Sequence, residues 1–287
     1  MDAGTRMTTS SRNVFGASLT GAPVTTALVA INVLVFMLLT VTGGSDNAAN
    51  LYRWGAKYGP AIADGEWWRL VLPIFMHIGF FHLLTNSIGL LIFGSMAEQL
   101  LGGRVYLSIY LVTGVLGNVA SYVISPTLGA GASGAVFGVI GAFGVYLLLN
   151  RRVMGEVARQ AITSIAFIIV LNLVIGFATS GIDNAAHLGG IVAGMAMAYL
   201  VAPRQRFVLT PGGYGISPAQ LGVHIQKRPG YMLVLAVVVA MVITVAATAI
   251  RSSDYPYPND FESCGYHFAD FSDPVGNFPF GCRSLRD

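Results

Sequence analysis

The chain alternates long apolar runs with short polar segments over most of its length. Seven runs come close to the roughly 20 residues that a helix needs to cross the hydrocarbon core of a bilayer. They cover residues 24–43, 79–100, 105–124, 132–149, 161–179, 185–202 and 231–250. This pattern predicts an all-α membrane protein, and we expect the first run to be a retained helix rather than a cleaved signal peptide.

Composition supports this prediction, and the basic residues orient the helices. Hydrophobic residues make up 54% of the 287 residues, whereas charged residues make up 10%. With the N-terminus inside, the inner segments hold ten Lys and Arg residues and the outer segments six, in keeping with the preference for positive charge on the inner side. We therefore expect the N-terminus inside and the C-terminus outside. A net charge of +3 gives no indication of nucleic-acid binding.

The Pro- and Gly-rich segment between the sixth and seventh runs is the best internal boundary. It separates a six-helix unit from one appended helix. The predicted parts are a cytoplasmic N-terminal segment, a six-helix core, a cytoplasmic linker, a seventh membrane helix and an extracytoplasmic tail, at residues 1–23, 24–202, 203–230, 231–250 and 251–287. The small Ala-, Gly- and Val-rich spans without organelle targeting indicate a bacterial cytoplasmic membrane.

Two of the predicted outer segments have distinctive compositions. Residues 44–78 are too aromatic and too apolar for a plain solvated linker, and "EWWRLVLPIF" within them indicates an element at the membrane interface, where Trp is favoured. The tail contains the only two cysteines, Cys264 and Cys282. We expect them to form a disulfide, because this topology places the tail in an oxidising compartment. The alternative is two separate thiols.

Few polar or ionisable residues lie within the runs, and each one is a functional candidate because it is costly to bury in a bilayer. His82 and Asn86 are four residues apart and therefore share a helical face. Two interpretations are open for this pair. The two side chains make hydrogen bonds between helices, or they are donors aimed at a common point near the outer surface.

Ser133 and His187 lie at the outer ends of two runs, and each has glycines on its own helix. Small residues let membrane helices approach closely, so these two faces could meet at equal depth. A histidine within reach of a serine hydroxyl is the minimum equipment for nucleophilic catalysis. The glycines concerned are Gly134, Gly138, Gly141, Gly190 and Gly194.

A metal site is the alternative use of the histidines. "HIGFFH" differs from the zinc-protease motif in its five-residue spacing and in having no carboxylate between the histidines. A site formed by His77, His82 and His187 would also lack a nearby acid to orient the imidazoles. We therefore predict no metal and no cofactor.

Two carboxylates near the runs are expected to have structural roles. Asp183 lies four residues before His187 and could complete a catalytic triad, but Asp commonly caps a helix N-terminus, and we expect that role here. Glu98 lies near the inner end of its run. We expect it to bond to backbone in the turn at Gly102 and Gly103.

Four short motifs follow one another along the chain: "EWWR" (66–69), "HIGFFHLLTN" (77–86), "GASG" (131–134) and "AHLGGIVAG" (186–194). Together they resemble the W-R, H-x4-H-x3-N, G-x-S-G and A-H-x2-G-x3-G motifs of the rhomboid family of intramembrane serine proteases. Each motif alone is weak, but four in order at the expected helix ends are specific. The resemblance covers about residues 24–202. It implies the family's six-plus-one form, with the first outer loop partly in the membrane.

The resemblance also implies a role for each candidate residue. Ser133 would be the nucleophile and His187 the general base and then acid, while His82, Asn86 and backbone N–H groups near Ser133 would form the oxyanion hole. The substrates would be transmembrane proteins within the lipid bilayer. Alternatives are a non-proteolytic rhomboid-like protein that binds membrane clients, and a small-solute transporter. One departure is Phe137, where relatives often carry a tyrosine beneath the histidine.

Overall fold

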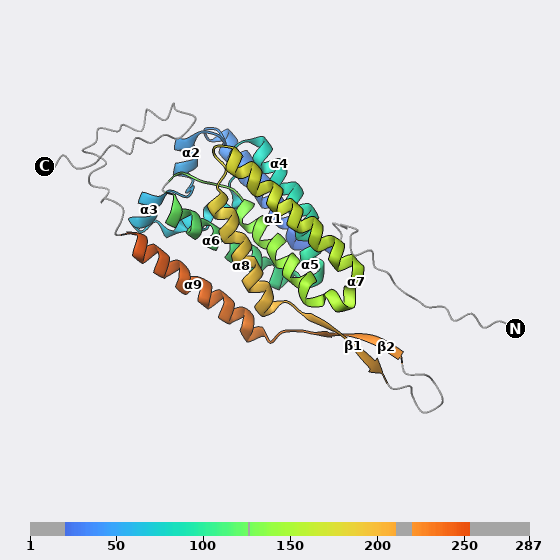
Figure 1. Ribbon diagram of the computed structural model, residues 1–287. Coiled ribbons are helices and arrows are strands. Elements are labelled where there is room, and N and C mark those ends of the chain that lie inside the picture. The colour runs from blue at the N-terminus through green and yellow to red at the C-terminus, as the bar shows by residue number, and fades with distance from the viewer. Residues whose placement is uncertain (1–20, 126, 211–219, 253–287) are drawn as a thin grey trace.

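The computed structural model describes residues 21–125, 127–210 and 220–252, and the structural statements below refer to these residues (Figure 1). Six of the described helices are long and apolar enough to cross a membrane, and they form one bundle. They are α1 (Pro23–Val41), the helical segment Phe80–Leu101, α6 (Gly103–Ile124), α7 (Ser133–Ala178), α8 (Asn184–Val201) and α9 (Gly230–Ser252). The predicted all-α membrane fold is thus confirmed.

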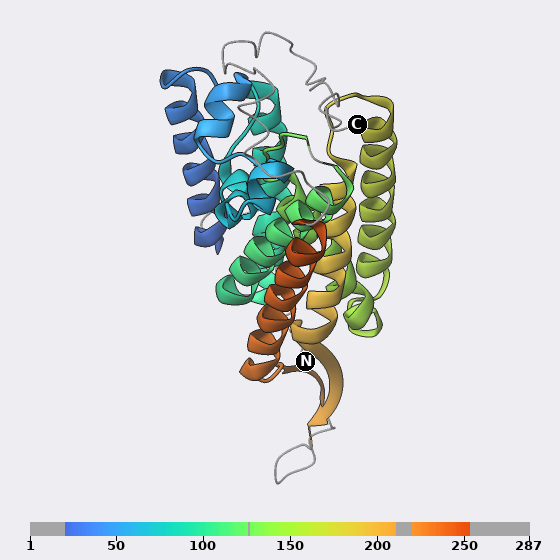
Figure 2. The same ribbon diagram turned by 90° about the vertical axis from the view of Figure 1, so that its left-hand side faces the viewer.

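Helix α7 accounts for two of the seven predicted spans. Its 46 residues would measure about 69 Å if straight, more than twice the thickness of a hydrocarbon core. The helical geometry breaks at Gly155, where φ is 58° and ψ is −132°. Figure 2 shows the yellow-green ribbon of α7 doubling back on itself. A Cβ at Gly144 would lie 3.7 Å from Ile165 Cγ2, so the two halves of α7 lie side by side. We call the end of the bundle where α7 begins the outer end, following the predicted topology.

The second predicted span is not one uniform helix. It consists of α4 (Phe80–Gly89), a π-helical turn (Leu90–Gly94) and α5 (Ser95–Leu101). At the end of the π turn, a Cβ on Gly94 would lie only 2.6 Å from the hydroxyl oxygen of Tyr106. The span therefore passes very close to α6 at this level. Single π-helical turns are rare in proteins, and those that occur often lie at functional sites.

Glu98 has a structural role, but its partner is not the one expected. It binds the start of α1 rather than the turn at Gly102 and Gly103. Its carboxylate accepts hydrogen bonds from the backbone N–H groups of Val24 at 2.9 Å and Thr25 at 2.8 Å. Helix α1 has no side-chain cap of its own, and a carboxylate is favourable at the positive N-terminal end of a helix.

The first outer loop is folded into short helices that Arg69 holds together. The elements are α2 (Ala48–Arg53), α3 (Gly59–Ala63) and two 3₁₀ turns (Trp67–Leu70 and Leu72–Phe75). The Arg69 guanidinium donates to the carbonyl oxygens of Tyr52 at 2.8 Å and Ala56 at 3.0 Å. Trp67 and Trp68 are more than half exposed, which suits side chains at the membrane interface.

The segment between α8 and α9 contains an antiparallel hairpin that the sequence analysis did not predict. Its strands are β1 (Arg204–Thr210) and β2 (Gln220–Gln226), and Figure 1 shows them extending beyond the helical bundle. Helix α9 then packs against α6 and α8. The predicted disulfide between Cys264 and Cys282 lies outside the described residues and stays a prediction.

Candidate active site

Helices α7 and α8 meet at the outer end with backbone against backbone. A Cβ built at Gly190 would collide with the carbonyl oxygen of Gly134, and one built at Gly194 would collide with that of Gly138. Only glycine fits at these two positions of α8. The glycines noted in the sequence therefore set the distance between the two helices, as expected for small residues in membrane helices.

This close approach brings Ser133 and His187 together. Ser133 is the first residue of α7 and His187 lies in the first turn of α8. The Ser133 Oγ atom is 2.9 Å from His187 Nε2. Phe137, one turn further along α7, packs against the imidazole with ring centroids 4.5 Å apart. The serine hydroxyl can therefore pass its proton to the imidazole when Nε2 is unprotonated.

No carboxylate holds the second nitrogen of this imidazole. His187 Nδ1 is buried and has no hydrogen-bond partner among the described residues. Asp183 instead accepts a hydrogen bond from the backbone N–H of Ala186 at 3.0 Å and another from the Ser121 hydroxyl. The expected capping role of Asp183 is confirmed. Ser133 and His187 thus form a pair rather than a triad, and packing must orient the imidazole.

His82 lies next to Gly131, which precedes Ser133 by two residues. A Cβ at Gly131 would lie 2.8 Å from His82 Nε2 and 3.6 Å from Ser133 Oγ. The Nδ1 atom of His82 accepts from the backbone N–H of Ile78 at 3.4 Å. This bond favours the neutral tautomer with its proton on Nε2, because a nitrogen that accepts cannot carry the proton. That N–H lies beside Gly131, close to the serine.

Asn86 and His77 are both buried near His82, but their side chains make different contacts with it. The Asn86 amide nitrogen donates to the carbonyl oxygen of His82 at 2.9 Å, and its second hydrogen has no acceptor among the described residues. His77 contacts His82 edge-on, with ring centroids 5.3 Å apart. Burial, and then the neighbouring His82, lowers the pKa of His77 to about 3, so His77 is neutral at physiological pH. Within the described ranges, no three His, Cys, Asp or Glu side chains come together as metal ligands would.

The start of α7 supplies further hydrogen-bond donors beside Ser133. The N–H of Val136 bonds to the carbonyl of Ala132 at 2.9 Å. The N–H groups of Ser133, Gly134 and Ala135 precede this bond, so they have no acceptor within the helix. The N-terminal end of a helix also carries a positive partial charge, which attracts anionic groups.

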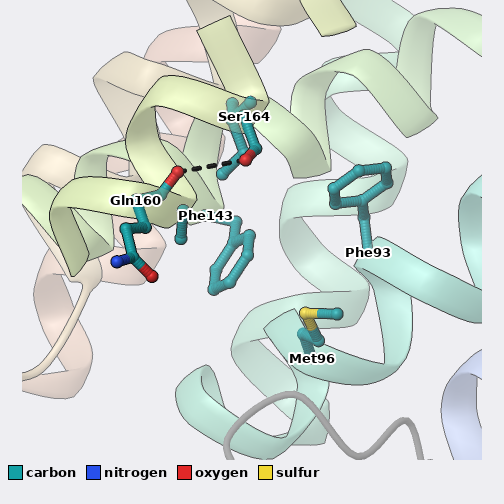
Figure 3. A pocket seen from close by; sticks show the side chains of 7 residues that line it. Phe93, Met96, Phe143, Gln160 and Ser164 are labelled. Carbon is teal, nitrogen blue, oxygen red and sulfur yellow. Dashed lines mark hydrogen bonds between the residues drawn. The ribbon is translucent and has the colours of Figure 1, made fainter. Parts of the chain in front are cut away.

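Another serine of α7, Ser164, lines a cavity elsewhere in the bundle and serves as a comparison for Ser133 (Figure 3). The cavity has a volume of about 360 Å³. Phe143, on its wall, follows Ser133 by ten residues on α7, which is about 15 Å along the helix. Ser164 donates to the backbone carbonyl of Gln160 at 3.1 Å, and no described histidine lines the cavity. The lining residues are Phe93, Met96, Phe143, Gln160, Ala161, Ser164 and Ile165.

One buried residue near the pair was not among the candidates that the sequence indicated. In the sequence Lys57 is one of the six basic residues of the predicted outer segments, yet its side chain is almost fully buried and donates to the Ser121 hydroxyl at 2.6 Å. No local signal in the sequence could have revealed this, because the contact joins segments more than 60 residues apart.

Comparison with known proteins identifies the family. A family model of the rhomboid domain matches residues 64–204, which include all four motifs. The chain is 45% identical over 186 residues to rhomboid protease GluP of Bacillus subtilis, a match that covers 64% of this chain and 36% of GluP. It is 32% identical over 189 residues to YdcA of the same organism, which covers 64% of this chain and 90% of YdcA. The chain belongs to the rhomboid family.

A relative from another organism extends this result. Rhomboid protease AarA of Providencia stuartii is 29% identical over 215 residues, a match that covers 66% of this chain and 76% of AarA. The matched rhomboid domain contains Ser133, His187, His82 and Asn86. The predicted resemblance is confirmed, and the chain is a multi-pass integral membrane protein. It spans little more than a third of the length of GluP.

Proposed function

We propose that this rhomboid-family protein is an intramembrane serine endopeptidase that hydrolyses peptide bonds in or next to transmembrane segments of other membrane proteins. The observation that carries the proposal is the 2.9 Å contact between Ser133 Oγ and His187 Nε2 at a glycine-packed helix interface. The relatives GluP and AarA, both named rhomboid proteases, support the reaction class. The GluP match supports a bacterial cytoplasmic membrane. The distribution of the basic residues supports a site near the outer face of that membrane.

The reaction starts at the serine hydroxyl. Ser133 Oγ attacks the carbonyl carbon of the scissile bond, while His187 Nε2 takes the hydroxyl proton and later gives it to the leaving amine. An acyl-enzyme remains on Ser133. His187 then takes a proton from a water molecule, whose oxygen attacks the ester carbon. His187 returns this proton to Ser133 Oγ as the bond between Oγ and the carbonyl carbon breaks, which releases the second product and restores the serine hydroxyl.

The donors around Ser133 stabilise the negative oxygen of the tetrahedral intermediate. They are the N–H groups at the start of α7, the Nε2–H of His82 and the free amide hydrogen of Asn86. A single donor of this kind is worth about 3–4 kcal/mol in the transition state. The N-terminal end of α7 adds a favourable partial charge.

The location of the pair near one end of the bundle allows water to take part. Ser133 is only partly buried, and an irregular segment of backbone, residues 127–132, leads into α7. Irregular backbone at membrane depth is tolerated where it lines a hydrated cavity or is buried in protein. Hydrolysis can therefore proceed at the outer end, while the lipid-facing helices enclose the rest of the core.

The test uses the purified full chain in detergent with a model transmembrane substrate. We expect the wild type to cleave the substrate, Ser133→Ala to be inactive, and Ser164→Ala to cleave at the wild-type rate as the matched serine control. Wild-type protein that binds the substrate without cleaving it would show instead a non-proteolytic, client-binding rhomboid. Cleavage by Ser133→Ala at the wild-type rate would also refute the proposal.

A further inference from the structure

Lys57 is a buried cation to which the proposed reaction assigns no role. It lies between α2 and α3, and its side chain is 1% exposed. The Nζ atom donates to Ser121 Oγ at 2.6 Å and to the carbonyl of Ser125 at 3.2 Å, and it lies 3.9 Å from Asp183 Oδ2. Burial lowers the pKa of Lys57, and the Asp183 carboxylate acts in the opposite direction. A buried ammonium group is costly unless it is paired, so these contacts fix the side chain in place.

The contacts of Lys57 join the outer loop to three helices. Its backbone N–H donates to the carbonyl of Gly129 at 2.8 Å, and the N–H of Gly129 donates back at 2.9 Å, in the segment that leads to Ser133. Ser121 lies in the last turn of α6 and donates to the Asp183 carboxylate. Asp183 is the N-cap of α8. One residue of the loop therefore ties together the end of α6 and the starts of α7 and α8.

Asp183 connects the contacts of Lys57 and Ser121 to His187. Its carboxylate accepts from the N–H of Ala186 at 3.0 Å, and its backbone carbonyl accepts from the N–H of His187 at 3.2 Å. Both bonds fix the first turn of α8. Because His187 Nδ1 has no partner among the described residues, the backbone of this turn and the Phe137 ring are left to set the direction of the imidazole.

We propose that Lys57 is a positioning residue for the Ser133–His187 pair and that it acts through Ser121 and Asp183. The inference rests on the proposed function. Held by Lys57, Asp183 fixes the depth and rotation at which α8 begins, and His187 Nε2 then faces Ser133 Oγ. Lys57 itself touches neither the substrate nor the reacting atoms. Loss of the tie lets the start of α8 shift, and a misplacement of 1 Å can cost about 100-fold in rate.

The test compares Lys57→Met and Ser121→Ala with Lys227→Met in the full chain. Lys227 is the only other lysine of the sequence and is exposed beyond β2, so it is the matched control. For each variant, kcat and KM on a model transmembrane substrate, the rate of Ser133 labelling by a fluorophosphonate, and the unfolding temperature are measured. We expect kcat and the labelling rate of Lys57→Met to fall about 10- to 100-fold, with KM unchanged. The Ser121→Ala losses should be smaller, and Lys227→Met should match the wild type.

Rescue and coupling distinguish positioning from a general loss of stability. Lys57→Arg keeps the cation and should recover most of kcat. Asp183→Asn keeps a capping oxygen but loses the charge, and combining it with Lys57→Met should cost no more than Lys57→Met alone, because both residues act through one link. Fully additive losses in this double variant would overturn the inference, as would Lys57→Met labelling at the wild-type rate. If Lys57→Met does not fold, Ser121→Ala decides: unchanged kcat refutes the inference.

The same experiment separates this inference from the proposed function. Wild-type protein that is not labelled, or Ser133→Ala that is labelled equally well, would remove the catalytic pair and with it any role in positioning. Labelling of the wild type but not of Ser133→Ala, combined with wild-type rates for Lys57→Met, would refute only the role of Lys57.

Discussion

The outer start of α7 and its parts nearer the inner end show opposite ways of packing a membrane helix. At the outer end, Gly134 and Gly138 bring α7 into backbone contact with α8, and Ser133 lies 2.9 Å from an imidazole nitrogen. Toward the inner end, α7 borders a cavity of about 360 Å³, and Ser164 bonds to its own helix. The hydroxyl group is the same at both ends. Its chemistry differs because the glycine contacts bring a histidine to only one of them.

Adding a methyl group where α7 and α8 are in backbone contact should have the largest effect on cleavage among the variants that leave the reacting side chains unchanged. Gly190→Ala would place a methyl group against the carbonyl oxygen of Gly134, so α8 must move and carry His187 away from Ser133. We expect cleavage to fall by about 100-fold or more and the free energy of unfolding to fall by about 1–3 kcal/mol. Cleavage assays and denaturation of the purified variant measure the two effects.

Gly144→Ala is the matched control, because a Cβ there meets Ile165 at an ordinary 3.7 Å. It should cleave at nearly the wild-type rate. Equal losses in both glycine variants would mean that any added methyl group disturbs α7, and the comparison between the two ends would fail.

Removing a donor at the outer end should have the next largest effect. Asn86→Ala loses the amide hydrogen that we assign to the oxyanion, and the loss of such a donor usually costs on the order of 100-fold in turnover. Membrane insertion and labelling of Ser133 should persist, since the Asn86 side chain otherwise makes one hydrogen bond among the described residues, to the carbonyl of His82. Unchanged turnover in the folded variant would show that Asn86 has a packing role alone.

Removing the carboxylate of Glu98 at the inner end should lower the free energy of unfolding but leave the cleavage rate unchanged. Glu98→Ala leaves the N–H groups of Val24 and Thr25 without their acceptor, which should lower the free energy of unfolding by about 1–3 kcal/mol. Glu98→Gln keeps an acceptor oxygen and should lose less. The cleavage rate per folded molecule should stay within about twofold of the wild type in both variants. A large loss of kcat in stable Glu98→Gln would connect the inner end to the reaction.

The sequence predicted the spans and the glycine-lined contact between Ser133 and His187 well, because both depend on local patterns. The apolar runs had the length of membrane helices, and glycines three and seven residues after His187 marked the face that contacts α7. The break in α7 was also anticipated, since its two halves were predicted as separate spans. The position of the break was not predicted. It depends on the non-helical conformation of Gly155 within residues 150–160, which composition alone does not indicate.

The features that the sequence did not reveal depend on contacts between distant segments. Glu98 was expected to bind a turn four residues away, whereas its partners are 73 and 74 residues away at the start of α1. In the sequence Lys57 is one of the basic residues of the outer loop, but its neighbours come from α6 and from the N-cap of α8. The strands β1 and β2 lie in a segment whose prolines and glycines indicated only a linker.

The most direct test of the pairing is the rate at which a fluorophosphonate labels Ser133 in the wild type and in His187→Ala. The probe reacts with an activated serine, so the measurement does not depend on knowing the natural substrate. If His187 is the base, labelling of folded His187→Ala should fall to the background of Ser133→Ala, because the two residues act as one unit. Labelling of His187→Ala at most of the wild-type rate would contradict the account and require another base for Ser133.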